Sequence, residues 1–381
     1  MLHYRVIVRI LRFVIIALSL SCAPGMYATL PDYTIITDGG IPTVSRGSVI
    51  RLLVSSEKLG DKLTVDVWFP DAYSPSAVQG FPVVYAFDGQ NLFDSRLSFS
   101  TVEWGIDEAV SRLVDGDGLT PPVIVGIHNR GAKNLRPNDY FPEKALAYIP
   151  EQALSQSYIM ETCVAGFFGD EHAAFVAEEL KPLIDNLFNT APDSSHTFAM
   201  GSSMGALASL YLFCEYPDIF GGAACMSTHW LGSLKMNPDY TLQPDPVCTR
   251  ALLDYLDAHL PIPASRRLYF DRGTTGWDAY YAEAETSARE IARRHGYSES
   301  AGTLMTHDAA GAGHNEWYWQ QRVDRPLAFL LMDKSSGIDD VEADIDNSDS
   351  DSPLYDLLGR PVKGHPNPGI YIKNRTKILV R

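Results

Sequence analysis

Strands and helices alternate along the chain from residue 81 to residue 331, and this order restricts the possible folds more than any other feature of the sequence. Several of the expected strands are apolar throughout, which is typical of strands covered on both faces. They occupy residues 81–87, 122–127 and 219–226, and a helix with one apolar side is expected at residues 104–114. The pattern predicts an α/β protein with a mostly parallel central sheet and helices on both faces.

The segment Gly201-Ser202-Ser203-Met204-Gly205 carries the pattern Gly-x-Ser-x-Gly. It follows a short apolar run at residues 197–200 and precedes a helical pattern that begins at Met204. A serine in a tight turn between strand and helix can be an exposed nucleophile, whereas the plainer alternative is a structural serine in a Gly-rich turn. The setting favours Ser203 as the nucleophile.

A serine nucleophile needs a histidine base and a carboxylate that orients it. Where the serine lies in a turn between strand and helix of this kind, these groups follow in the order serine, acid, histidine. His314 comes after the small residues 311–313 and is favoured as the base over His307, which belongs to an expected strand. Asp271 directly follows the expected strand at 267–270, and Asp278 lies seven residues further on. Spacing alone leaves both aspartates open as the acid.

An oxyanion intermediate needs backbone N–H donors. The expected donors are the N–H of Met204 and an N–H at Gln90, in the loop after the strand at residues 81–87. Polar and aromatic residues that follow other strands are candidates for substrate binding, because the carboxyl ends of parallel strands share one edge of the sheet. These candidates are Asn129, Arg130, His229 and Trp230.

With these residues placed, the chain resembles the esterase family of α/β hydrolases, which includes carbohydrate esterase family 1 and the enterochelin-esterase-like proteins. The resemblance covers about residues 48–333. The matching segments are Phe87-Asp88-Gly89-Gln90-Asn91-Leu92-Phe93-Asp94, Glu103-Trp104-Gly105-Ile106-Asp107-Glu108, Val125-Gly126-Ile127, Gly201-Ser202-Ser203-Met204-Gly205, Tyr216-Pro217-Asp218-Ile219-Phe220 and Gly311-Ala312-Gly313-His314-Asn315-Glu316 with Trp319. The resemblance implies an α/β-hydrolase fold at residues 48–335.

In similar sequences the acid is an aspartate after a Gly-Thr segment, so the resemblance favours Asp278 in Gly273-Thr274-Thr275-Gly276-Trp277-Asp278. It also assigns Gln90 to the oxyanion loop. The function it implies is that of a serine carboxylesterase acting on acylated plant polysaccharides or oligosaccharides, of the acetylxylan or feruloyl esterase type, with no cofactor. The alternatives are a siderophore esterase of the enterochelin type and a non-catalytic carbohydrate-binding surface protein.

The N-terminus has the features of an export signal at residues 1–23, followed by an extension at 24–47. A basic start precedes an apolar run at residues 13–20 that is too short for a stable membrane span. Cys22 is an alternative lipid-attachment site. These features predict a secreted or cell-surface protein. The formal net charge of -16 argues against nucleic acid as a partner.

After removal of the signal, four cysteines remain, and of these only Cys163 and Cys248 are considered as a disulfide pair. The spacing of Cys and His predicts no metal site. Residues 336–352 are rich in Asp and are expected to form a linker. Residues 353–381 resemble the C-terminal sorting tails of type IX secretion substrates, so secretion machinery is an expected partner, beside the ester substrate.

Overall fold

A nine-stranded sheet forms the centre of the protein. The computed structural model describes residues 30–331, 362, 369–373 and 376–380. The strand order is β1-β2-β3-β5-β4-β6-β7-β8-β9. The strands are β1 (Tyr33–Ile36), β2 (Ser48–Ser56), β3 (Asp61–Phe69), β4 (Val83–Phe87), β5 (Val123–Ile127), β6 (Thr197–Ser202), β7 (Gly222–Met226), β8 (Arg267–Gly273) and β9 (Leu304–Ala309).

The sheet is antiparallel at one end and parallel over the rest. β1 pairs with β2, β2 with β3, and β3 with β5, all antiparallel. From β5 through β4, β6, β7 and β8 to β9 every pair is parallel. The loops after these strands therefore meet at one edge, and the predicted α/β fold is confirmed. Strand β1 lies within the predicted extension at 24–47, and its four residues are too few to show a strand pattern in the sequence.

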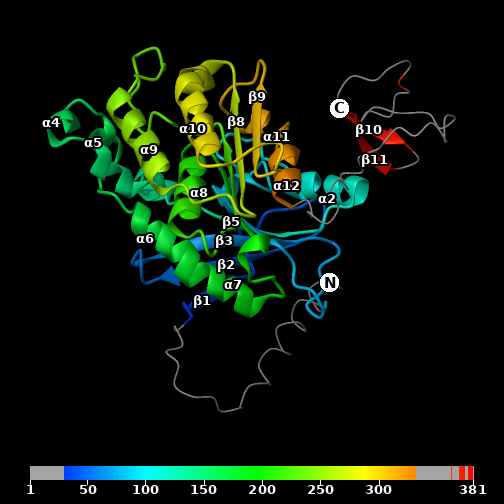
Figure 1. Cartoon of the computed structure of the whole chain (residues 1–381). Coiled ribbons are helices and arrows are strands. Elements are labelled where there is room, and N and C mark those ends of the chain that lie inside the picture. The colour runs from blue at the N-terminus through cyan, green and yellow to red at the C-terminus, as the bar shows by residue number, and fades with distance from the viewer. Residues whose placement is uncertain (1–29, 332–361, 363–368, 374–375, 381) are drawn as a thin grey trace, which may run out of the picture. The chain divides into compact units, whose positions relative to one another are not determined.

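Helices cover both faces of the sheet, as Figure 1 shows for α8, α9 and α10 on one side and α2, α11 and α12 on the other. The helices are α2 (Ile106–Asp117), α3 (Arg136–Tyr140), α4 (Glu151–Leu154), α5 (Ile159–Thr162), α6 (Gly169–Ala174), α7 (Lys181–Leu187), α8 (Met204–Glu215), α9 (Pro246–His259), α10 (Ala282–Arg294), α11 (Glu316–Gln320) and α12 (Asp324–Leu331). A π-helical turn at Phe175–Leu180 joins α6 to α7.

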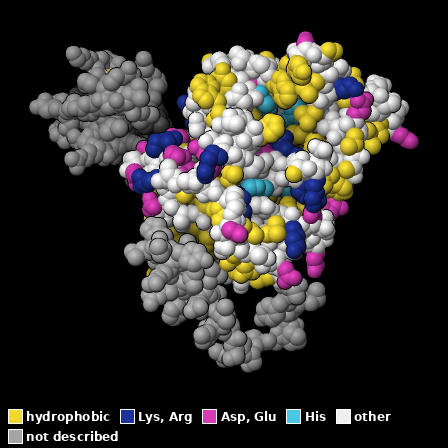
Figure 2. Space-filling view, turned by 180° about the vertical axis from the view of Figure 1, so that it is seen from behind, with side chains coloured by type: hydrophobic (Ala, Val, Ile, Leu, Met, Phe, Trp, Pro, Cys, Tyr) yellow, Lys and Arg dark blue, Asp and Glu magenta, His cyan; other side chains and the backbone are white. Residues whose placement is uncertain are grey.

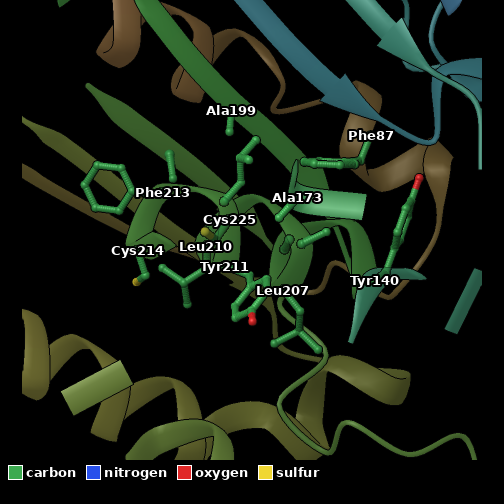
Figure 3. Packing of buried hydrophobic residues seen from close by; sticks show 14 of the residues in the cluster. Phe87, Tyr140, Ala173, Ala199, Leu207, Leu210, Tyr211, Phe213, Cys214 and Cys225 are labelled. Atoms are coloured by element: carbon green, nitrogen blue, oxygen red, sulfur yellow. The ribbon is translucent and has the colours of Figure 1, made fainter. Parts of the chain in front are cut away.

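Alternate residues of each central strand supply two separate hydrophobic cores. In β4, Val83, Tyr85 and Phe87 pack with the core on the side of α8, and Val84 and Ala86 pack with the core on the side of α2 and α12. Figure 3 shows part of the first core, where Leu207, Leu210 and Tyr211 of α8 pack near Ala173 and Tyr140. Burial on both faces explains why these strands are apolar throughout.

Helix α8 is buried along almost its whole length, from Met204 to Cys214. It packs on β6 and β7 and is covered by α6, α3 and α9. A helix enclosed in this way has no polar side, in contrast to α2 and α10. The enclosure holds its first turn, and therefore Ser203, at a fixed place on the sheet edge.

The chain divides into two compact units, Met1–Leu331 and Met332–Arg381. In the second unit, β10 (Gly369–Lys373) and β11 (Thr376–Val380) form an antiparallel hairpin. Both strands lie in the predicted tail at 353–381. The predicted signal peptide, Cys22, and the linker at 336–352 lie outside the described residues. Within the described part of the chain, no helix has the length and apolar character needed to cross a membrane.

Candidate active site

Ser203 occupies the turn between β6 and α8 in a strained backbone conformation, with φ 57° and ψ −124°. Its N–H donates to the carbonyl of Met226 at 2.9 Å. A Cβ added at Gly201 would lie 2.3 Å from the carbonyl oxygen of Gly205, and one at Gly205 would lie 3.2 Å from Cβ of Phe87. Position 201 therefore requires glycine. The close packing of the turn holds Ser203 in a backbone conformation that costs about 1–3 kcal/mol.

His314 joins Ser203 to Asp278 through hydrogen bonds at both ring nitrogens. Nε2 of His314 lies 2.8 Å from Oγ of Ser203, and Nδ1 lies 2.5 Å from Oδ1 of Asp278. The imidazole is nearly buried, with 7% of its side chain exposed. The rings of Trp277, Tyr281 and Trp319 surround it at centroid distances of 5.6, 5.5 and 5.1 Å. These three rings restrict the orientation of the imidazole.

Asp278 is fully buried in the 3-10 helix η6 (Gly276–Tyr281) that follows β8. Besides His314, it accepts hydrogen bonds at Oδ2 from the N–H of Gly273 at 2.5 Å and from Oγ of Ser227 at 2.7 Å. Burial alone raises the pKa of this carboxyl, but these hydrogen bonds and His314 outweigh that effect, and the pKa is lowered. Asp278 is therefore ionised and suited to hold His314 in one tautomer.

The alternative acid, Asp271, has a different environment. It lies inside β8, which continues to Gly273 rather than ending at residue 270. Its carboxylate accepts hydrogen bonds from Nε of Arg322 at 2.9 Å and from the hydroxyl of Tyr269 at 2.8 Å. Of the two aspartates that spacing left open, Asp278 bonds to His314 and Asp271 bonds to Arg322. The other histidine considered, His307, lies within β9.

The two expected oxyanion donors lie in segments that pack against each other. Met204 is the first residue of α8, and the first N–H groups of a helix have no acceptor within it. In the 3-10 turn after β4, the first N–H that donates within the turn is that of Asn91, to Asp88 at 2.9 Å. The N–H of Gln90 comes one residue earlier and has no acceptor within this turn. Both groups are therefore available to a ligand, and the dipole of α8 favours negative charge there.

Arg136 and Asn129 hold the loop that carries Gln90. The guanidinium of Arg136 donates to both carboxylate oxygens of Asp88, at 2.8 and 2.7 Å. Nδ2 of Asn129 donates to Asp88 at 2.5 Å, and its backbone N–H donates to Oε1 of Gln90 at 3.3 Å. Asp88 has a positive φ of 59°. Asn129, expected to bind substrate, thus stabilises the loop in this structure.

The other three residues expected to bind substrate are engaged inside the protein. Arg130 donates to Asp139 and Asp61. His229 and Trp230 are fully buried. The ring nitrogens of His229 contact Tyr281 and the carbonyl of Ser233, and burial lowers the pKa of His229 to about 3, which leaves it neutral. In this structure the three side chains are held by partners within the protein, and their role in substrate binding stays a prediction.

Trp230 donates through Nε1 to the buried carboxyl of Glu285 at 2.7 Å. Burial raises the pKa of Glu285 to about 7, against the opposing effect of Arg289. The folded protein therefore binds a proton that the unfolded chain releases at about pH 4.5. We expect the free energy of unfolding to fall by up to about 3 kcal/mol as the pH rises from about 4.5 to about 7, and to change little above that from this group. Urea unfolding across this range measures the effect.

Glu285→Gln is the matched variant, because its amide oxygen still accepts from Trp230 but cannot ionise. The difference in unfolding free energy between wild type and Glu285→Gln should therefore depend on pH in this range. A difference that stays constant from pH 5 to pH 8 would show that Glu285 ionises normally.

Two buried residues that contact the site were not predicted from the sequence. Ser227 follows β7 and bonds to Asp278, and Arg322, between α11 and α12, bonds to Oγ of Ser227 at 2.7 Å. Ser227 directly precedes Thr228, His229 and Trp230. Its position at the end of a strand could have indicated a place in the site, but no sequence motif distinguishes this serine from others. No local sequence pattern indicated a role for Arg322, because its partners Asp271 and Ser227 lie far away in the sequence.

A mostly parallel sheet with a strained serine, a histidine and an aspartate at its carboxyl edge defines the class of α/β hydrolases. Within this class, a family model described as "Putative esterase" matches residues 56–330, and the chain belongs to this family. The resemblance inferred from the sequence motifs is confirmed.

Two curated relatives are proteins of Bacillus subtilis (strain 168) described as uncharacterized. YjcH is 26% identical over 197 residues, which cover 51% of this chain and 68% of YjcH. YbbA is 24% identical over 178 residues, which cover 46% of this chain and 61% of YbbA.

Solved structures share the fold. A ferulic acid esterase has a TM-score of 0.52 and 18% identity, covering 76% of this chain and 99% of that protein. The enterobactin esterase FES from Shigella flexneri has a TM-score of 0.54 and 16% identity, covering 76% of this chain but only 60% of that chain. An IroE-like serine hydrolase from Shewanella oneidensis has a TM-score of 0.51 and 16% identity, covering 74% of this chain and 79% of that chain.

Proposed function

We propose that the protein is a secreted serine carboxylesterase that acts through an acyl-enzyme on Ser203. The hydrogen bond of 2.8 Å between Nε2 of His314 and Oγ of Ser203 carries this proposal, because it places a base beside the nucleophile. The bond from Nδ1 of His314 to Asp278 supports it by leaving Nε2 free to accept the serine proton.

In the proposed reaction, Oγ of Ser203 attacks the ester carbonyl carbon while its proton passes to Nε2 of His314. The oxyanion accepts hydrogen bonds from the N–H groups of Gln90 and Met204, and loss of one such donor typically costs about 10²–10³ in rate. The C–O bond to the alcohol then breaks, and His314 returns the proton to the leaving oxygen. A water molecule then loses a proton to His314 and attacks the acyl-enzyme. The bond between the acyl carbon and Oγ of Ser203 breaks, His314 returns the proton to this oxygen, and the acid is released.

The proposed substrates are acyl esters on plant polysaccharides or oligosaccharides. Exposed aromatic side chains support a ring-containing substrate, since such rings stack on sugars and phenolic acids. Trp317, which follows His314 by three residues, is 51% exposed, and Tyr240 is 78% exposed. The carbonyl of Tyr240 accepts from Nε1 of Trp277, whose ring lies beside His314. Trp104 and Trp230 are fully buried and do not contribute.

The mixed surface also suits a neutral substrate better than a polyanion such as nucleic acid. Figure 2 shows acidic and basic side chains interspersed on one face, together with groups of hydrophobic side chains and several histidines. The proposals of export by an N-terminal signal, and of secretion through the tail at 353–381, rest on the sequence features alone. Growth medium and cell fractions of the producing organism are the direct test of both.

A siderophore esterase of the enterochelin type is the second candidate, because the enterobactin esterase shares the fold. We expect feruloylated or acetylated xylan to be hydrolysed with a higher kcat/KM than enterobactin. Liquid chromatography of released ferulate, acetate and the benzoyl-serine product gives the rates. A higher kcat/KM on enterobactin would overturn the polysaccharide assignment and favour the siderophore reading.

A further inference from the structure

Ser227 lies behind Asp278 and is hydrogen-bonded to Asp278, Trp319 and Arg322 through its hydroxyl. It follows β7 and has a positive φ of 45°. Its backbone N–H donates to the carbonyl oxygen of Asp271 at 2.8 Å, and its hydroxyl donates to Oδ2 of Asp278 at 2.7 Å. Nε1 of Trp319 at 3.0 Å and Nη2 of Arg322 at 2.7 Å both donate to the same hydroxyl oxygen.

These partners fix the direction of the hydroxyl proton. A serine hydroxyl has one proton and two acceptor sites, and here both acceptor sites are filled by groups that can only donate. The indole of Trp319 is a donor only, and the guanidinium of Arg322 keeps its protons at all relevant pH values. The hydroxyl of Ser227 must therefore donate to Asp278, which stabilises the ionised form of that carboxyl.

Asp271 keeps Arg322 in place. Its carboxylate accepts from Nε of Arg322 at 2.9 Å and from Nη2 at 3.1 Å, and it is fully buried. The charge of Arg322 neutralises this second buried carboxylate, which would otherwise repel Asp278. A continuous chain of hydrogen bonds thus runs from Asp271 through Arg322 and Ser227 to Asp278, and from there to His314 and Ser203.

We propose that Ser227, supported by Arg322 and Asp271, is a positioning residue for the acid of the catalytic triad. This inference rests on the proposed esterase function. Ser227 holds Oδ2 of Asp278 and so turns Oδ1 toward Nδ1 of His314. It also draws negative charge away from Oδ1, so that Asp278 stabilises a positive charge on His314 less strongly than an unbonded carboxylate would.

Ser227→Ala is expected to lower kcat for an activated acetyl ester roughly 10- to 100-fold with little change in KM, because the loss affects orientation in the reaction rather than substrate binding. The acidic limb of the pH–rate profile should move to higher pH, since Asp278 then presents more negative charge to His314. Ser227→Gly should give the same two changes. It removes the same hydroxyl, and a positive φ is unstrained in glycine, which protects the test against a folding failure.

Thr228→Val is the matched control. Thr228 is the next residue and fully buried, and its hydroxyl has no hydrogen-bond partner among the described residues. The control should keep the wild-type kcat and pH profile. If the folded Ser227 variants also keep both, Ser227 is only structural and the inference is wrong. If Ser203→Ala itself remains fully active, the proposed function fails, which is a separate result.

Discussion

Ser203→Ala is expected to lower kcat for p-nitrophenyl acetate by roughly 10⁵- to 10⁶-fold, because the variant cannot form the acyl-enzyme. Substrate binding should be nearly unchanged, since the hydroxyl is a small part of the contact surface. The backbone N–H groups of Gln90 and Met204 remain and should leave a residual rate above that of water. Initial rates measured by p-nitrophenolate release give the comparison.

Ser202→Ala is the matched control for this prediction. Ser202 is the neighbouring residue, is also buried, and forms the end of β6. Its replacement should change kcat by no more than a few-fold. Equal rates for wild type and Ser203→Ala would refute the serine esterase. If neither protein exceeds the uncatalysed rate, the non-catalytic, carbohydrate-binding alternative is favoured.

Asp278→Asn should lower kcat by about 10⁴-fold at neutral pH with the fold intact. An asparagine amide opposite Nδ1 of His314 favours the tautomer that carries its proton on Nε2, and this nitrogen can then no longer accept the proton of Ser203. The carboxylate also stabilises the imidazolium that forms during the reaction. Stopped-flow or steady-state rates on the same ester measure the loss.

Asp271→Asn provides the contrast, because Asp271 pairs with Arg322 rather than with His314. Removing one partner of a buried ion pair typically costs about 3–5 kcal/mol, so the free energy of unfolding should fall by that order. The folded fraction should retain much more activity than Asp278→Asn. If instead Asp278→Asn is as active as wild type and Asp271→Asn is inactive, the acid has been assigned to the wrong residue.

The fold could be predicted from the sequence because its central strands leave a strong signal. Residues 81–87 and 122–127 are apolar throughout since both faces of β4 and β5 are covered, and few other environments produce that pattern. Strand β1 was missed because Tyr33–Ile36 is a short edge strand with exposed and half-buried residues. Its pairing with β2 depends on tertiary contacts that no local pattern records.

The sequence indicated turns at the sheet edge for both Ser203 and His314. Ser203 lies between Gly201 and Gly205, and His314 follows the small residues 311–313. The choice between Asp271 and Asp278 could not be made from spacing, because β8 continues to Gly273 and so places Asp271 in the sheet instead of the loop. His229 and Trp230 were placed at the correct edge, but the direction of a side chain there depends on distant partners such as Tyr281 and Glu285. Ser227 and Arg322 were missed for the same reason.

Labelling with a fluorophosphonate tests the central claim most directly. Oγ of Ser203 should attack phosphorus, form a P–O bond and release fluoride, while His314 takes the serine proton. Mass spectrometry of the digested protein should then find one phosphonyl group on the peptide that contains Ser203, and Ser203→Ala should remain unlabelled. An unlabelled wild-type protein, or an adduct on a different residue that persists in Ser203→Ala, would contradict the assignment of Ser203 as the nucleophile.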